Sequence, residues 1–206
     1  RVAHTTFLGN ASAPAVTLAQ RLVALAPEPL TRVFYSDSGS TAVEIALKMA
    51  WQFWQQVDDG AGQNRRKFIT LGNAYHGDTI GAVSLGGIDI FHARYGGLLF
   101  ETVQGPSPSA YRHPAHLTRE EAEEAAVREL EALISTHGDE LAAVVIEPGM
   151  QGAAGILTQP DGFLRRVKAA VEAAGSLLIL DEVAVGFGRS GKTMFACEAL
   201  GVVPDI

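Results

Sequence analysis

The sequence has a single cysteine, Cys197, among its 206 residues. One cysteine cannot form a disulfide bond within the chain, which is typical of proteins of the reducing cytosol, so we expect a cytoplasmic protein. No apolar run reaches the roughly 20 residues that a membrane-spanning helix needs. Arg1 to His4 do not begin a secretory signal peptide. The sequence therefore predicts no membrane partner.

Charged residues are also scarce, at 19% of the chain. A disordered acidic chain would carry many more, so we expect a folded protein despite the net charge of −7. That charge, with no cluster of Lys and Arg to oppose it, disfavours a nucleic-acid partner. We expect no metal site. The hydrophobic content of 47% is enough for a sizeable core, with one domain as the first expectation.

The stretch from Leu177 to Gly191 organises the chain. Its four apolar residues, Leu177–Leu180, indicate a strand buried on both faces, as in a parallel sheet covered by helices. Asp181 and Glu182 follow this strand, and a glycine-rich loop comes next. Ligands of open α/β sheets bind beyond the carboxyl ends of the strands, which is where Asp181 falls. Since a buried carboxylate is costly without a partner, Asp181 should meet a cation or a hydrogen-bond donor.

Strand and helix patterns alternate along the rest of the chain, which predicts a doubly wound α/β fold with a mostly parallel sheet and helices on both faces. Capping boxes are expected at Thr41–Glu44 and at Thr118–Glu121. The expected strands are residues 32–36, 67–71, 141–146 and 177–180, and the expected helices are residues 12–26, 41–57, 118–136 and 162–174, with short helical pieces in 79–95 and a surface loop over 58–64.

Several polar or glycine-bearing turns directly follow predicted strands, and in a parallel sheet they would share one edge. The turn at Gly39 and Ser40 opens a helix whose free N–H groups suit a phosphate, although plain helix capping is about equally expected. Tyr75 beside His76 could stack on a flat ring or titrate near neutral pH, but such a pair by itself is more often a packed loop aromatic. Glu147 could bind a ligand, or it could hydrogen-bond the following backbone.

A rival motif lies in the glycine loop. Residues 186–193 satisfy the pattern G-x-x-x-x-G-K-[ST] of nucleotide-hydrolase phosphate loops. The context disagrees, because Asp181 and Glu182 would repel a triphosphate. The helix that should follow, Met194 to Leu200, is also short. We therefore keep the P-loop nucleotide hydrolase only as a distant alternative.

Taken together, these motifs resemble the class III aminotransferases, which use pyridoxal phosphate on the fold-type-I scaffold. The resemblance covers most of the chain in the family's order. The matching segments are residues 37–44, 75–79, 146–148, 180–183 and 186–189. It implies that residues 1–30 are a lead-in segment with a helix, and that residues 31–206 are part of the cofactor-binding large domain.

The resemblance also implies roles for individual residues. Asp181 would pair with the pyridine nitrogen, Tyr75 and Val183 would pack on the two faces of the ring, and Glu147 would lie near it. Gly39 and Ser40 would hold the cofactor phosphate. Arg189 and Tyr75 would shape the substrate side. Family members are homodimers with sites at the subunit interface, so a homodimer acting on small-molecule substrates is implied.

Three segments, residues 106–112, 151–155 and 195–198, are most similar to the class members of biotin synthesis. Those enzymes move an amino group from S-adenosylmethionine to 8-amino-7-oxononanoate. The runner-up is an ω-amino acid:pyruvate aminotransferase. Ala153 stands where ornithine- and GABA-type relatives carry a glutamate, which argues against those substrates. A further alternative is a domain that holds the cofactor weakly, or not at all, and mainly forms subunit contacts.

The sequence departs from the family at its most important group. Family enzymes bind the cofactor through a lysine in a Ser-Lys-Gly-like context on a later strand, and none of Lys48, Lys67, Lys168 and Lys192 matches that position. We therefore expect a fragment of the large domain that is inactive by itself and has no catalytic residue of its own. Val185 replaces an expected Thr, so a hydroxyl is lost there.

Overall fold

The computed structural model describes residues 7–57, 62–191 and 193–206 and divides the chain into two compact units, Arg1–Tyr35 and Ser36–Ile206. The first unit contains helix α1 (Ala13–Leu25), whose N-cap Ser12 accepts a hydrogen bond from the Ala15 N–H. The strand expected over residues 32–36 is wrong. No strand among the described residues pairs with them, and Phe34 is 64% exposed.

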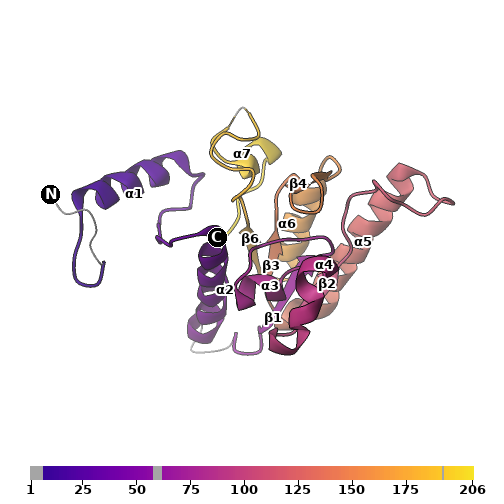
Figure 1. The fold of residues 1–206 in the computed structure, drawn as a ribbon, viewed down its shortest axis with the longest axis horizontal. Helices are drawn as coiled ribbons and strands as arrows, with labels where there is room; N and C mark the ends of the chain where they lie inside the picture. The colour runs from indigo at the N-terminus through magenta and orange to yellow at the C-terminus, as the bar shows by residue number, and fades with distance from the viewer. Residues whose placement is uncertain (1–6, 58–61, 192) are drawn as a thin grey trace. The chain divides into compact units, whose positions relative to one another are not determined.

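The second unit is built on a four-stranded sheet in the order β2 (Val103–Gly105), β1 (Lys67–Leu71), β3 (Leu141–Ile146) and β6 (Leu177–Leu180). All three neighbouring pairs are parallel, as predicted (Figure 1). Every residue of β3 is buried, as its unbroken apolar run requires in a sheet covered on both faces. β2 was not predicted, because three residues are too few to show a strand pattern.

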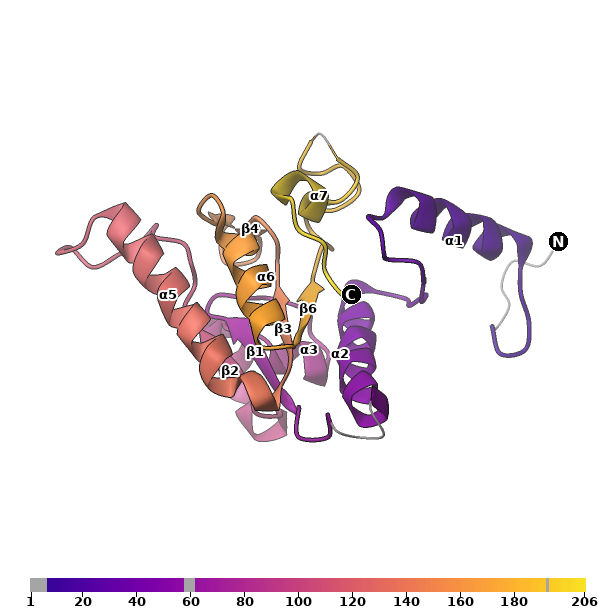
Figure 2. The ribbon, with the colours of Figure 1, turned by 180° about the vertical axis from the view of Figure 1, so that it is seen from behind.

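Helices cover both faces of this sheet, which confirms the predicted architecture (Figure 2). On one face, α2 (Gly39–Gln56) packs Val43, Leu47 and Ala50 against the sheet together with α3 (Ile80–Ser84). On the other face, α5 (Arg119–His137) and α6 (Phe163–Ala173) bury Leu130, Ile134, Val167 and their neighbours. Each helix presents one apolar stripe, so the sheet lies between two hydrophobic cores.

Helix starts depend on local hydrogen bonds. Thr118 and Glu121 form the predicted capping box at α5. The capping box expected at Thr41–Glu44 is wrong, because Ser38 is the N-cap of α2 and Thr41 is its partner.

The other elements are α4 (Asp89–His92), η2 (Ala93–Leu98), η3 (Gly138–Glu140), the antiparallel pair β4 (Met150–Gln151) and β5 (Leu157–Thr158), and α7 (Ala196–Leu200).

Arg65 joins several segments at the amino edge of the sheet. Its guanidinium donates hydrogen bonds to the carbonyls of Gly138, Leu141 and Ala174, at 2.7, 3.1 and 3.1 Å, and it lies 4.5 Å from the ring of Trp54. Gly138 precedes β3, Leu141 begins β3, Ala174 precedes β6, and Trp54 lies near the end of α2. One side chain therefore holds the starts of two strands in place.

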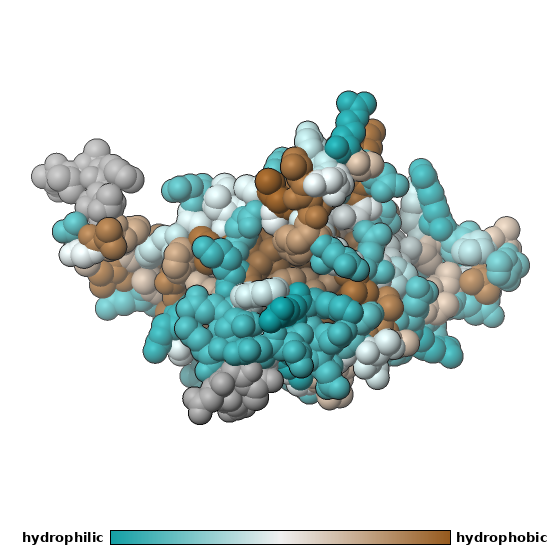
Figure 3. Space-filling model, turned by 90° about the horizontal axis from the view of Figure 1, so that it is seen from below, coloured by the Kyte–Doolittle hydropathy of each residue, from teal (hydrophilic) through white to brown (hydrophobic). Residues whose placement is uncertain are grey.

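Hydrophobic side chains also reach the surface among hydrophilic ones (Figure 3). Within the part of the chain that the structure describes, no helix has the length and apolar character needed to cross a membrane.

Candidate functional site

Asp181 lies at the carboxyl edge of the sheet, directly after β6, and its N–H donates to the carbonyl of Ile146 at 2.8 Å. Its Oδ2 is 2.8 Å from His76 Nδ1, and the two side chains are 6% and 0% exposed. Its Oδ1 accepts the N–H of Val183 at 3.1 Å. The buried carboxylate thus has a partner on each oxygen, as its burial requires.

Glu147 follows β3 at the same edge and is also buried. One of its oxygens accepts the N–H of Gly152 at 3.1 Å and the other accepts the N–H of Tyr75 at 3.3 Å. Burial raises the pKa of this carboxyl. The bond to Gly152 confirms the expectation that Glu147 hydrogen-bonds the backbone that follows it. The bond to Tyr75 fixes the backbone of the loop that follows β1.

Tyr75 and His76 come from that loop, which begins after β1. The Tyr75 hydroxyl donates to Asp78 Oδ2 at 2.9 Å, and this bond raises the pKa of the phenol. The Tyr75 ring lies nearly parallel to the buried His92 ring, with centroids 6.3 Å apart. The Tyr75 side chain is therefore packed against its own loop. The residue is only half-buried, so part of it remains accessible.

The start of α2 meets the Asp181 segment. A Cβ on Gly39 would lie 3.0 Å from the Val183 side chain, so any larger residue there would press against Val183. Ser40 Oγ accepts the N–H of Asp78 at 3.2 Å. The Ser38 side chain accepts the N–H of Thr41, which confirms the helix-capping interpretation. The N–H groups of Gly39 and Ser40 lie in the first turn of α2, where they have no intrahelical partner.

The glycine loop after Asp181 is held by Glu182, whose two oxygens accept the N–H groups of Ala196 and Cys197 at 2.7 and 2.8 Å. Val183 is 70% exposed on this segment. Arg189 is exposed, and no hydrogen bond or ion pair joins its guanidinium to another described residue. The structure thus brings Gly39, Ser40, Tyr75, Glu147, Asp181 and Val183 to one edge, and among the described residues no hydrogen bond or ion pair joins the Arg189 guanidinium to any of them.

The phosphate-loop alternative is wrong. A nucleotide-hydrolase loop must run straight into a helix, but residues 193–195 form bends and α7 begins only at Ala196. Thr193 donates its hydroxyl to the carbonyl of Phe195 at 2.6 Å. Lys192 lies outside the described residues. The five residues of α7 are too few for the helix that such a loop requires.

The other lysines lie away from this edge. Lys67 begins β1 at the amino edge and pairs with Glu140 at 2.6 Å. Lys168 on α6 lies 3.4 Å from Asp205. Lys48 is exposed on α2. None of these three amines contacts Asp181 or Tyr75, which agrees with the sequence analysis.

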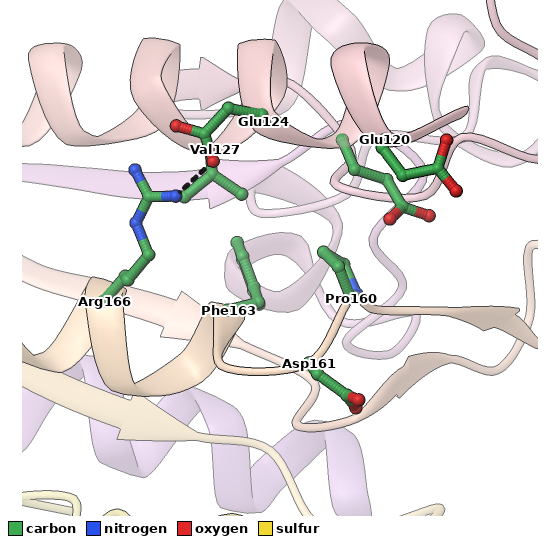
Figure 4. Close-up of a pocket in the computed structure, with 8 residues that line it drawn as sticks. Glu120, Glu124, Val127, Pro160, Asp161, Phe163 and Arg166 are labelled. Atoms are coloured by element: carbon green, nitrogen blue, oxygen red, sulfur yellow. Dashed lines mark hydrogen bonds and ion pairs between the residues drawn. The ribbon is translucent and has the colours of Figure 1, made fainter. Parts of the chain in front are cut away.

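A separate hollow lies between α5 and the start of α6 (Figure 4). Arg166 reaches across it to Glu124 and also binds Glu131 at 2.6 Å. These carboxylates raise the pKa of the guanidinium further above its usual range. None of the predicted site residues lines this hollow, and the ion cluster joins two helices.

Sequence reasoning missed His76 as the partner of Asp181 and Glu182 as the anchor of the glycine loop. His76 and Asp181 are 105 positions apart, and no local period signals such a pair. The only available signal was that both residues follow predicted strands of one parallel sheet.

The carboxyl edge fits a flat cofactor with a cationic ring nitrogen and a phosphate. The buried Asp181 can meet the nitrogen, and the exposed Val183 side chain offers an aliphatic surface beside it. The start of α2, with glycine at its first position, lies against Val183 and offers backbone N–H groups to an anion. The residues present therefore suit such a group.

The model of the family described as "Aminotransferase class-III" matches residues 1–206. An adenosylmethionine-8-amino-7-oxononanoate aminotransferase from Nitratidesulfovibrio vulgaris is 55% identical over the whole chain, which covers 38% of that protein. The corresponding protein of Anoxybacillus flavithermus is 49% identical, and the chain covers 44% of it. The chain thus spans less than half the length of these relatives.

Solved structures agree with the sequence comparison. The crystal structure of adenosylmethionine-8-amino-7-oxononanoate aminotransferase from Methanocaldococcus jannaschii is 40% identical, with a TM-score of 0.82 over 95% of this chain and 41% of that one. An (S)-enantioselective omega-transaminase from Thermomicrobium roseum is 37% identical, with a TM-score of 0.88 over 97% of this chain and 44% of that one.

Proposed function

Because this chain belongs to the class III aminotransferases, we propose that the protein transfers an amino group from S-adenosylmethionine to 8-amino-7-oxononanoate, with pyridoxal phosphate as cofactor. The product would be 7,8-diaminononanoate, as in biotin biosynthesis. Residues 31–206 would form part of the cofactor-binding large domain.

The observation that carries this proposal is the buried carboxylate of Asp181, held on both oxygens at the carboxyl edge and next to the start of α2. An acceptor-only group fixed in this way is suited to pairing with a ring nitrogen and keeping it protonated. Bound pyridoxal phosphate would supply a ring that takes up electrons from the substrate carbon.

The other residues would position the cofactor. Gly39 and Ser40 would hold its phosphate through first-turn N–H groups, and the Ser40 hydroxyl, which already accepts from Asp78, has its proton free to donate. Tyr75 and Val183 would cover the two faces of the ring. Glu147 would hold the Tyr75 backbone in place. Arg189 would contact substrate.

The choice of donor and acceptor rests on relatives. The proteins with 40–55% identity carry the name of the biotin-pathway enzyme, whereas the omega-transaminase is 37% identical. The second candidate, an ω-amino acid:pyruvate aminotransferase, is favoured by the higher TM-score of that structure, 0.88 against 0.82. We favour the first because sequence identity reports on the site more directly than backbone likeness.

The test uses the full-length gene product and measures 7,8-diaminononanoate by mass spectrometry. Asp181→Asn cannot keep the ring nitrogen protonated, so turnover should fall at least about 100-fold. Asp139→Asn, an exposed carboxylate at the amino edge, is the matched control and should keep normal turnover. Unchanged turnover in Asp181→Asn would contradict the role given to this residue.

Substrate competition separates the two candidates. The proposal expects the wild-type protein to use S-adenosylmethionine and 8-amino-7-oxononanoate in preference to an ω-amino acid and pyruvate. Efficient transfer to pyruvate with no product from 8-amino-7-oxononanoate would replace the first candidate by the second.

A further inference from the structure

We propose that Gln151 is a positioning residue for Tyr75: its amide fixes the turn after β1 from which the tyrosine is directed to the face of the cofactor ring. This inference rests on the proposed function, which places Tyr75 on that ring. Gln151 and its partner Ser107 belong to two of the segments that are most similar to the class members of biotin synthesis, residues 151–155 and 106–112. The roles given above use neither residue.

Gln151 is a buried polar residue that joins three loops at the carboxyl edge of the sheet. It lies in β4, which follows β3, and it is 1% exposed. Its Nε2 donates to the carbonyl of Gly72, directly after β1, at 2.7 Å. Its Oε1 accepts the hydroxyl of Ser107, shortly after β2, at 2.6 Å. One amide therefore connects the segments that follow three neighbouring strands.

The hydrogen-bond partners fix the orientation of this amide. The Gly72 carbonyl can only accept, so the amide nitrogen of Gln151 must face it, and the amide oxygen is left to accept from Ser107. An apolar side chain at this position would leave the carbonyl and the hydroxyl without these bonds. Because buried polar groups are costly without partners, the turn would have to move to find new ones.

Gln151 and Glu147 hold the turn after β1 at two points. The turn contains Asn73, which has a left-handed backbone with a φ of 65°. Gln151 binds the carbonyl of Gly72 at the start of the turn, and Glu147 accepts the N–H of Tyr75 at its end, at 3.3 Å. With one of these anchors the turn could pivot, whereas two anchors set the direction in which the Tyr75 ring leaves the loop.

The first experiment is a double-mutant cycle in the full-length gene product. Gln151→Met keeps the length of the side chain and removes both hydrogen bonds, and Tyr75→Ala removes the ring. One readout is the dissociation constant of pyridoxal phosphate from an absorbance titration. The other is the circular dichroism of the saturated protein in the cofactor's absorption band, which reports the packing around the ring. Gln63→Met, on an exposed glutamine of the loop before β1, is the control.

We expect Gln151→Met to weaken cofactor binding about tenfold and to reduce the dichroism band, while the control stays at the wild-type values. Because Gln151 acts through Tyr75, adding Gln151→Met to Tyr75→Ala should weaken binding by less than about twofold more. Two full losses that multiply in the double variant would overturn the inference, since Gln151 would then only stabilise the fold.

Gln151→Glu provides a second test, which holds even where the Met variant does not fold. A protonated carboxyl can donate to Gly72 and accept from Ser107 as the amide does, whereas an ionised one only accepts and would repel the Gly72 carbonyl. Burial should raise the pKa of this new carboxyl above the ordinary value of about 4.3. The variant should therefore bind pyridoxal phosphate like the wild type below that pKa, and about tenfold more weakly as the pH rises through it.

The dissociation constant of the variant is divided by that of the wild type at each pH from about 5 to about 8. Glu147, His76 and Asp181 also lie at this edge, but the wild type has them too, so the ratio isolates the new carboxyl. Gln63→Glu should give a ratio near one throughout. A ratio for Gln151→Glu that does not change with pH would contradict the inference. A wild-type protein that binds no cofactor would instead sink the proposed function.

Discussion

At the scale of single residues, His92 makes the stability of the fold depend on pH. Its ring is buried beside Tyr75, its Nδ1 accepts the N–H of Ile88 at 3.1 Å, and burial lowers its pKa from the ordinary 6.5. Because the folded pKa lies below the unfolded one, the stability from neutral His92 is present above pH 6.5 and is lost as the pH falls through the folded pKa.

The matched variant is His92→Asn, whose side-chain oxygen can still accept from Ile88 and does not titrate. We expect the urea midpoint of the wild type to fall more steeply than that of the variant as the pH drops from about 7 to about 5, around the ordinary histidine pKa. Parallel curves would show that His92 does not carry this dependence.

Some residues of the site were predictable because they follow strands, whereas Gly39 and Ser40 follow residues 32–36, which form no strand. Asp181 and Glu147 were found in this way, since carboxylates directly after apolar runs stand out in a sequence. Which of these side chains touch was not predictable. The contact of His76 with Asp181 depends on the order β1–β3–β6, which places the ends of two strands on either side of a third.

At the scale of elements, the start of α2 should carry a function that the start of α5 lacks. Ser38→Ala and Thr118→Ala each remove an N-cap, so each should cost about 1 kcal/mol of stability. Only Ser38→Ala should also weaken pyridoxal phosphate binding, because it disturbs the turn that contains Gly39 and Ser40. Thermal unfolding and the cofactor dissociation constant measure the two effects. An equal loss of cofactor affinity in both variants would contradict the phosphate role of α2.

Elements with long patterns were predicted well, and short ones were not. The unbroken apolar run of β3 and the amphipathic α5 each contain enough residues to reveal their period. β2 has three residues, and β4 and β5 have two each, so tertiary contacts decide their pairing. Residues 32–36 show the reverse case, an apolar pattern that pairs with no strand in the described part of the chain.

At the scale of the whole molecule, we expect the full-length protein to be a homodimer. Ile90 and Phe91 on α4 and Tyr95 and Leu98 on η2 are 84%, 47%, 52% and 65% exposed, and several exposed apolar side chains within one short segment are typical of an interface. Sedimentation should give twice the mass of one chain. Ile90→Lys should shift the equilibrium toward monomer, with Thr136→Lys on the exposed face of α5 as the control. A monomeric wild-type protein would contradict this expectation.

The position of Arg65 has a consequence for how this fold can change over time. Arg65, which holds the starts of β3 and β6, lies at the amino edge of the sheet. The residues proposed to bind the cofactor, such as Asp181, lie at the opposite edge, a full strand length away. Loops at the carboxyl rim can thus vary in sequence and acquire new substrates while the fastening at the other rim is left intact. Such a division of labour makes the scaffold a favourable starting point for directed evolution.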